Sequence, residues 1–207
     1  MSLICILTAY LLGSINSAIL LSKLFSLEDP RTVGSGNAGA TNMLRLAGKG
    51  LASLVLGADF LKGLLAVGLA NLLGVTGTAL GFVALAAVIG HVLPLYTGFR
   101  GGKGVATTAG VCFGLSFYLG VILILVWMAV MLHYRYSSLA GLMAATVMPL
   151  LAGAYDGRYF LPLGMIAALI FIAHRDNIVR LMAGTEPTID ANKLEAANDE
   201  PPSSSEK

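Results

Sequence analysis

The sequence is poor in charge. Only 12% of its 207 residues are Asp, Glu, Lys or Arg, whereas 57% are hydrophobic, and an average soluble domain carries about 25% charged residues. Together with a mean hydropathy of +0.82, this composition excludes an ordinary soluble domain and indicates a chain embedded in a membrane. The 25 glycines fit this class, because closely packed transmembrane helices are rich in small residues.

Cysteine is scarce as well: the chain has only Cys5 and Cys112, both within apolar runs. The sequence contains no CxxC pair, which argues against a disulfide framework, a zinc site and a redox motif. It also lacks an HExxH motif, a GxSxG elbow and a carboxylate cluster able to hold two metals. We therefore expect no metal, no cofactor and no acyl-enzyme serine.

The few charges are distributed unevenly along the chain. Residues 1–173 contain nine Lys or Arg against four acids, whereas residues 174–207 contain four basic and seven acidic residues. A basic membrane-embedded body suggests contact with membrane lipids and anionic substrates. Basic clusters interleaved with aromatic residues are absent, so nucleic acid is not an expected partner.

Six apolar runs are candidates for membrane segments. They are 3–21, 51–73, 77–96, 105–132, 139–155 and 159–173. As one helix the run 105–132 would be about 42 Å long, against a hydrocarbon core of about 30 Å. Gly114 and Gly120 flank polar residues near its middle, so we predict two segments there, 104–115 and 118–134.

Basic residues decide between six crossings and seven. Seven crossings with the N-terminus outside give the cytoplasmic loops 22–50, 97–103, 133–138 and 174–207. These loops hold eleven of the thirteen Lys and Arg, and Arg158 alone lies in an outer loop. The positive-inside rule therefore predicts an all-α integral membrane protein of about seven transmembrane helices, with the N-terminus outside and the C-terminus cytoplasmic.

The chain reads as one domain followed by a tail. Residues 1–184 are predicted to form the membrane-embedded domain. From Thr185 onward the sequence is polar, acidic and rich in Pro and Ser. We expect 185–207 to be a disordered cytoplasmic tail.

The first of three polar segments that carry chemistry is GSGNAGATN at 34–42, followed by Arg45. Its glycines allow several backbone N–H groups to point at one spot, and its polar side chains add donors. Arg45 can bind a phosphate through two parallel hydrogen bonds. A Gly-rich turn between helices is the alternative, but such turns seldom need this many polar side chains, so we favour an anion site.

The second and third segments are GFRGGKG at 98–104 and HRDNIVR at 174–180. Lys103 lies among glycines at a predicted helix N-terminus, which is a favourable anion site. In the third segment His174 and Asn177 share one helix face, where they can contact a phosphate or orient a hydroxyl. A purely topological role suits Arg100, and membrane-surface snorkelling suits Arg175 and Arg180.

Two charges lie inside a predicted membrane segment. Asp59 and Lys62 are three residues apart, and intramembrane charges are candidates for function by default. They can also simply neutralise each other, and we favour that structural role. His91 is as compatible with a hydrogen bond to a neighbouring helix as with chemistry, and His133 suits the membrane interface.

At these segments the sequence resembles the PlsY family, the bacterial acyl-phosphate:glycerol-3-phosphate acyltransferases. The matching stretches are GSGNAGATN at 34–42, GHVLPLYTGFRGGKGVAT at 90–107, HRDNIVRLMAGTE at 174–186 and DFLKG at 59–63. The order and spacing of the motifs are highly specific, and the similarity runs over about residues 3–186. The acidic extension after 186 departs from a minimal member, and we assign it no catalytic work.

The resemblance implies an enzyme of the bacterial inner membrane with a cytoplasmic active site. Family members transfer a fatty acyl group from acyl phosphate to the 1-hydroxyl of glycerol 3-phosphate, giving lysophosphatidic acid and phosphate for phospholipid biosynthesis. They need no metal, and the enzyme that supplies acyl phosphate is an implied partner. By similarity the residues for catalysis and substrate binding are Ser35, Arg45, Lys103, His174 and Asn177. The predicted phosphate-binding residues are Gly34, Gly36, Asn37, Thr41, Asn42, Gly101, Gly102 and Gly104.

Three alternatives stay open. The general base is either His174 or the phosphate of the acyl donor itself, and we favour the phosphate. A transporter for a phosphorylated lipid is a second function class, although it would need polar groups on both membrane sides. An acyltransferase that uses acyl-CoA is a third possibility, but the HxxxxD motif expected of that chemistry is absent, since Tyr96 and Val179 occupy the Asp positions after His91 and His174.

Overall fold

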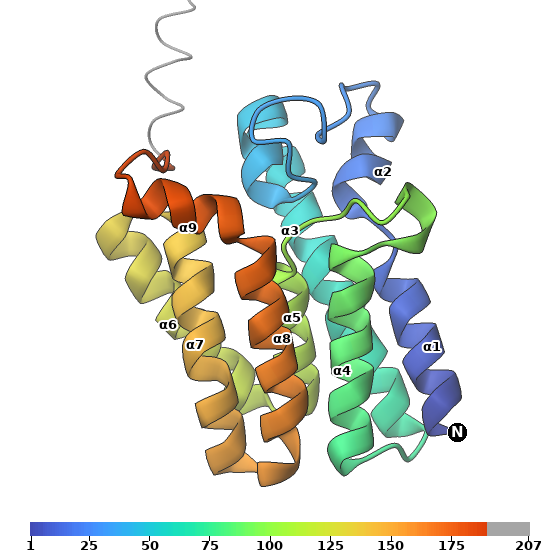
Figure 1. Cartoon of the computed structure of the whole chain (residues 1–207). Helices are drawn as coiled ribbons and strands as arrows, with labels where there is room; N and C mark the ends of the chain where they lie inside the picture. The colour runs from blue at the N-terminus through green and yellow to red at the C-terminus, as the bar shows by residue number, and fades with distance from the viewer. Residues whose placement is uncertain (190–207) are drawn as a thin grey trace, which may run out of the picture.

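The computed structural model describes residues 1–189, which are helical and contain no strand. The α-helices are α1 (Ser2–Gly13), α2 (Ser17–Leu24), α3 (Ala40–Leu72), α4 (Gly77–Val92), α5 (Val105–Leu115), α6 (Phe117–Tyr134), α7 (Ser137–Tyr155), α8 (Phe160–Ala173) and α9 (Arg175–Met182), and the 3-10 turns are η1 (Leu95–Thr97) and η2 (Gly157–Tyr159). The long helices stand side by side in one bundle (Figure 1). The all-α expectation is confirmed.

The helices match the predicted apolar segments closely. Four of them among residues 1–189, namely α3, α4 with η1, α6 and α7, are each long and apolar enough to cross a membrane, and two bent pairs raise that number to six. The shorter apolar helix α5 is separate from α6, with the break at Ser116, as predicted for this run. The count of seven crossings and the orientation of the termini remain predictions.

The first apolar run differs from the single helix predicted over 3–21. The structure breaks it into α1 and α2, bent by 42°. Asn16 begins α2 by accepting a hydrogen bond from the Ile19 amide at 3.0 Å. Lys62 Nζ donates to the freed carbonyl of Ile15 at 2.8 Å, so the break leaves this carbonyl satisfied.

The predicted loop 22–50 is also partly helical. Helix α3 already begins at Ala40, and it passes through a kink at Gly48, whose φ of 75° is left-handed. A residue without a side chain adopts this conformation at little cost. The kink divides the first turns of α3, which carry Arg45, from the long membrane-embedded part, which carries Asp59 and Lys62.

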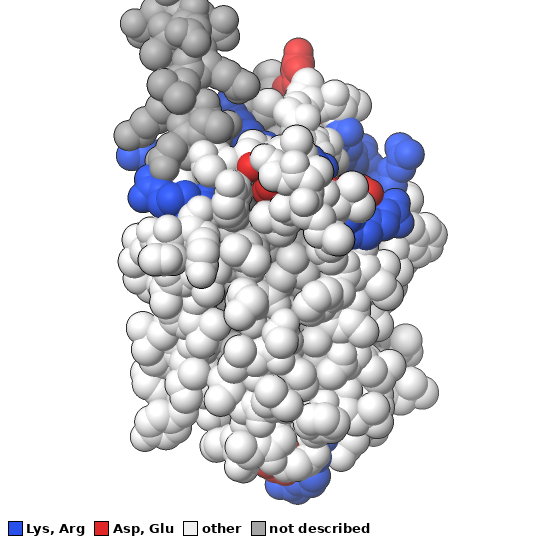
Figure 2. Space-filling view, turned by 60° about the vertical axis from the view of Figure 1, so that its left-hand side comes forward, with Lys and Arg blue, Asp and Glu red and all other residues white. Residues whose placement is uncertain are grey.

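On the face of the molecule seen in Figure 2, surface charge lies at the two ends of the bundle. In Figure 2 the Lys, Arg, Asp and Glu side chains gather mainly at the upper end, a small group lies at the lower end, and the band between them is uncharged. The connections at the upper end are the long segments 25–39 and 93–104 and the region around α9, whereas residues 73–76 form a short connection at the other end (Figure 1). The three polar segments therefore meet at one end.

Glycines let α3 and α5 approach each other at the distance of backbone contact. A Cβ on Gly110 would overlap the carbonyl oxygen of Phe60 and lie 2.9 Å from the Leu64 amide nitrogen, and a Cβ on Gly63 would overlap the carbonyl oxygen of Thr107. Small residues at helix interfaces are the usual basis of such packing in membranes. These contacts fix the position of α5, which begins at Val105, two residues after Lys103.

A Gly110→Ala substitution tests this contact. We expect it to destabilise the protein by about 1–3 kcal/mol, because the added methyl forces the two backbones apart. The matched control is Gly68→Ala in α3, where a Cβ meets no atom within 4 Å, and we expect its stability to be unchanged or raised. Thermal unfolding of both variants in detergent measures the effect; equal midpoints would contradict the close approach.

Candidate active site

A cavity of about 850 Å³ opens between the three polar segments and continues between the helices. Its polar wall contains Ser35, Asn37, Thr41, Arg45, Lys103, Ser137, Ser138, His174, Asn177, Arg180 and Glu186. Its apolar wall contains Leu56, Phe60, Leu123, Ile124, Trp127, Met128, Ala144, Ala145, Met148 and Ile170. The cavity therefore offers charge and hydrogen bonds at one end and hydrocarbon along the other.

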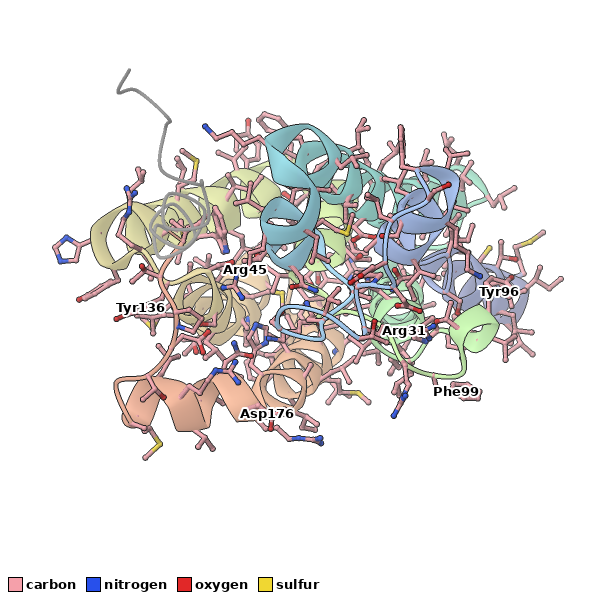
Figure 3. The ribbon with its side chains drawn as sticks, turned by 90° about the horizontal axis from the view of Figure 1, so that it is seen from above. Arg31, Arg45, Tyr96, Phe99, Tyr136 and Asp176 are labelled. Atoms are coloured by element: carbon pink, nitrogen blue, oxygen red, sulfur yellow. The ribbon has the colours of Figure 1, made fainter. Side chains whose placement is uncertain are left out.

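Arg45 reaches the cavity from the first turns of α3. Seen from the polar end, it lies toward the middle of the ring of helices, whereas Tyr96, Phe99 and Asp176 lie nearer the edge (Figure 3). Its buried Nε has no hydrogen-bond partner among residues 1–189. A buried cationic donor without a partner beside a cavity suits an anionic ligand.

Asn42 holds the first glycine segment in shape instead of lining the cavity. Its Oδ1 accepts the Ser35 amide at 2.9 Å, and its Nδ2 donates to the carbonyls of Pro30 at 2.8 Å and Val33 at 3.1 Å. These three bonds use most of the hydrogen-bonding capacity of the amide side chain. Asn42 thus fixes the conformation of the loop from which Ser35 lines the cavity.

Lys103 enters the cavity from the second glycine segment. Gly104, with a φ of 84°, turns the chain into the first turn of α5. Lys103 Nζ donates to Asn177 Oδ1, which joins the second polar segment to the third. Burial disfavours the charged ammonium and lowers the pKa of Lys103 to about 8.

His174 and Asn177 meet the cavity at the bend between α8 and α9, where the chain turns by 62°. Both are buried. His174 Nδ1 lies 2.9 Å from the carbonyl oxygen of Ile170, and a carbonyl can only accept, so Nδ1 carries the proton. In the neutral ring Nε2 then holds the free lone pair, close to Gly141 on the cavity wall.

Glu186 is a site residue that the sequence reasoning missed. Its carboxylate accepts hydrogen bonds from Ser138 Oγ at 2.6 Å, Asn177 Nδ2 at 2.6 Å and Arg180 Nε at 2.7 Å. Burial opposes ionisation, but these hydrogen bonds outweigh it and lower the pKa of Glu186. It lies two residues beyond the predicted domain boundary at 184, and of the predicted tail only 185–189 is described.

Nine of the thirteen predicted site residues line the cavity. Those that do are Gly34, Ser35, Asn37, Thr41, Arg45, Lys103, Gly104, His174 and Asn177. Those that do not are Gly36, Asn42, Gly101 and Gly102. The last two pack against His91, since a Cβ on either would overlap an atom of that residue. Arg175 and Asp176 point to solvent, with exposures of 78% and 76%. The expected membrane-surface role of Arg180 is wrong, because Arg180 lines the cavity and pairs with Glu186.

Ser137, Ser138 and Trp127 are further cavity residues that no sequence argument identified. Ser137 Oγ lies 3.1 Å from Thr41 Oγ1 and so links the start of α7 to the start of α3. Trp127 Nε1 is buried without a partner among the described residues. The sequence gives only a weak indication that these residues belong to a site. A Ser-Ser pair at the start of a helix is typical of a helix cap, and a tryptophan in an apolar helix is typical of packing.

The chain resembles known acyltransferases along almost its whole length. A family model described as "Glycerol-3-phosphate acyltransferase" matches residues 3–184. A curated relative of that name from Coxiella burnetii (strain RSA 493 / Nine Mile phase I) is 50% identical over 190 residues, covering 90% of this chain and 97% of its own. One from Shewanella putrefaciens is 44% identical over 193 residues, covering 93% and 95%. The chain belongs to the glycerol-3-phosphate acyltransferase family.

Two solved structures of PlsY, an integral membrane glycerol 3-phosphate acyltransferase, share the fold at 39% identity. The glycerol 3-phosphate form superimposes with a TM-score of 0.88 over 94% of this chain and 98% of the other, and the lysophosphatidic acid form with 0.84 over 90% and 94%. The predicted family and integral membrane class are confirmed. The activity of the family is acyl transfer to glycerol 3-phosphate, which favours the enzyme over the transporter.

The pKa of Lys103 predicts how activity depends on pH. Its ammonium loses a proton as the pH rises through about 8, so attraction for a phosphate is lost and kcat/KM for glycerol 3-phosphate should fall above that pH. A Lys103→Arg enzyme keeps its charge, so its fall should move to higher pH or disappear. If kcat/KM falls at the same alkaline pH in the wild type and in Lys103→Arg, the fall belongs to a group other than Lys103.

Proposed function

We propose that the chain transfers a fatty acyl group from acyl phosphate to the 1-hydroxyl of sn-glycerol 3-phosphate. The products are 1-acyl-glycerol 3-phosphate, which is lysophosphatidic acid, and inorganic phosphate. The observation that carries the proposal is the cavity itself, which joins several phosphate-binding groups to a hydrocarbon wall in a member of this family. The proposal includes no metal and no cofactor.

Two phosphates need more than one cationic group, and the polar wall supplies them. Arg45 enters from α3, Lys103 from the segment before α5, and Arg180 from α9. Arg180 already pairs with Glu186, which leaves Arg45 and Lys103 as the main phosphate ligands. Ser35 and Asn37 add neutral donors from the first glycine segment, so we assign phosphate binding to these four residues.

The reaction needs little beyond alignment, because acyl phosphate is an activated mixed anhydride. The 1-hydroxyl oxygen attacks the acyl carbonyl carbon, the bond from that carbon to the phosphate oxygen breaks, and the hydroxyl proton leaves with inorganic phosphate. Correct orientation of two bound reactants is worth about 7–11 kcal/mol. Lys103 and the N–H groups of the glycine segments can also stabilise the oxyanion that forms at the carbonyl.

The proton acceptor has two candidates. His174 has a neutral Nε2 facing the cavity wall, which suits a general base. The departing phosphate of the donor, however, lies next to the attacking hydroxyl in any productive arrangement. We favour the phosphate as acceptor and assign His174 and Asn177 to binding and orienting the substrates.

A His174→Gln enzyme separates these two routes. If the donor phosphate takes the proton, kcat at saturating substrates should stay within about tenfold of the wild type, because a general base contributes about a hundredfold or more. Gln keeps a hydrogen-bonding group near the position of Nε2. A loss of a hundredfold or more in kcat, with unchanged affinity for glycerol 3-phosphate, would identify His174 as the base.

The donor is tested directly by comparing activated acyl groups. Purified protein in detergent without added metal receives labelled glycerol 3-phosphate with palmitoyl phosphate, palmitoyl-CoA or palmitoyl-acyl-carrier protein. We expect lysophosphatidic acid from palmitoyl phosphate alone, and a loss of about a hundredfold or more in Lys103→Ala. The control is Lys49→Ala, since Lys49 is exposed and outside the cavity. Product from either thioester donor at a similar rate would refute the choice of acyl phosphate.

The location that fits this proposal is the bacterial inner membrane, with the cavity facing the cytoplasm. Basic side chains gather at the cavity end of the bundle (Figure 2), which agrees with the positive-inside rule. Glycerol 3-phosphate and acyl phosphate are then the substrates, membrane lipids surround the bundle, and an enzyme that makes acyl phosphate is the proposed source of the donor.

A further inference from the structure

A buried polar cluster is formed by Ser17, Asp59, Lys62, His91 and Thr107, and two of its members, Asp59 and His91, also line the inner part of the cavity. Each of them is at most 5% exposed. The Asp59 carboxylate accepts a hydrogen bond from Ser17 Oγ at 2.9 Å and pairs with Lys62 Nζ at 2.8 Å. Its Oδ1 also lies 3.5 Å from His91 Nδ1. The cluster joins α2, α3, α4 and α5.

His91 touches the Lys103 segment on both sides. Its carbonyl oxygen accepts the Gly102 amide at 3.2 Å, and its Nε2 fills the space where a Cβ on Gly102 would stand. Its Nδ1 lies 3.1 Å from Thr107 Oγ1, one turn into α5. The residue before Lys103 and the residue four positions after it therefore contact one side chain.

Asp59 gives this side chain a fixed charged neighbour. The carboxylate and Thr107 both face His91 Nδ1, so the ring cannot rotate without losing a polar contact in a buried site. Outer partners of this kind fix the orientation of the groups that bind a ligand. A buried ion pair contributes little net stability to a fold, because replacing both partners by apolar residues is often neutral or stabilising. Stability alone therefore does not explain the pair.

We propose that Asp59, His91 and Thr107 are positioning residues for Lys103. They hold the glycine segment and the first turn of α5 in the one arrangement that points the Lys103 ammonium at the substrate phosphate. This inference rests on the proposed role of Lys103 in phosphate binding. On this proposal the pair of Asp59 and Lys62 supports substrate binding. If the two charges only neutralised each other, removing both would leave the affinity for glycerol 3-phosphate unchanged.

The first test removes one hydroxyl. Thr107→Val keeps the side-chain volume but loses the contact with His91, whereas Thr107→Ser keeps the contact. The control is Thr146→Val in α7, where the hydroxyl bonds the Leu142 carbonyl at 2.9 Å and the residue lies outside the cavity lining. Calorimetric titration with glycerol 3-phosphate measures Kd, and thermal unfolding in detergent measures stability.

We expect Thr107→Val to raise the Kd for glycerol 3-phosphate about tenfold, since small misplacements of binding groups are costly. Thr107→Ser and Thr146→Val should stay within about twofold of the wild type. The thermal midpoints of the two Thr107 variants should agree. A Thr107→Val protein that binds glycerol 3-phosphate like the wild type, or one whose loss of affinity merely follows a lower thermal midpoint, would overturn the proposal.

The second test addresses the charge pair. The double variant Asp59→Asn with Lys62→Met removes both charges together, so no uncompensated charge stays buried. It also loses the Lys62 bond to the Ile15 carbonyl, so its thermal midpoint is measured together with its Kd, and a rise in Kd that merely follows a lower midpoint counts against the proposal. We expect its Kd to rise as in Thr107→Val, whereas wild-type affinity would show that the pair only neutralises itself. These titrations need no acyl donor. A failure of the donor assay above therefore leaves them valid, while wild-type affinity in Lys103→Ala would overturn the role of Lys103 on which the inference rests.

Discussion

The backbone contact between α3 and α5 is the constraint on which the site depends. Gly63 and Gly110 allow each helix to touch the main chain of the other. One of these helices carries Arg45 and the other follows Lys103, so the contact helps to set the separation between two cationic side chains that line the cavity from different segments. Because packed interiors transmit small shifts, a methyl group added at this helix contact would also change the polar end of the cavity.

The site is also an electrostatic compromise. Lys103 is buried at the cavity wall, where the proposed phosphate contact would be desolvated, and that burial lowers its pKa to about 8. Glu186, fixed by Ser138, Asn177 and Arg180, provides negative charge nearby, which supports the protonated form of Lys103. The carboxylate does so without a direct bond to the lysine, because Asn177 lies between them.

Patterns of hydrophobicity predicted most of the fold, and motif spacing predicted most of the cavity. The long apolar runs and the break at Ser116 could be read from the sequence, because hydrocarbon thickness limits helix length. The break at Ile15 could not be read in this way, since it depends on a hydrogen bond from Lys62, forty-seven residues away. The kink at Gly48 was equally hidden, because a glycine is compatible with a straight helix, a kink or a loop.

Sequence reasoning predicted nine of the residues that line the cavity, but it did not predict which of the motif residues line the cavity and which shape the loops around it. Asn42 and Gly102 belong to the motifs, yet they shape the binding segments instead of lining the cavity. Glu186 lies at the end of the third motif and joins the site only because the chain folds back after α9. Such roles follow from tertiary contacts, which a spacing of residues does not specify.

The pair of Asp156 and Arg158, at the end of the bundle opposite the cavity, has a consequence for how the protein enters a membrane. Arg158 donates from Nη2 and Nε to the Asp156 carboxylate at 2.7 and 3.0 Å, and the partners are two residues apart. On the predicted orientation this is the outer loop that must be translocated. An unpaired charge moved against a membrane potential costs about 2.3 kcal/mol per 100 mV, whereas a loop of zero net charge crosses with no net electrical work. On the predicted orientation, Asp156 therefore offsets part of the electrical work of moving Arg158 across the membrane.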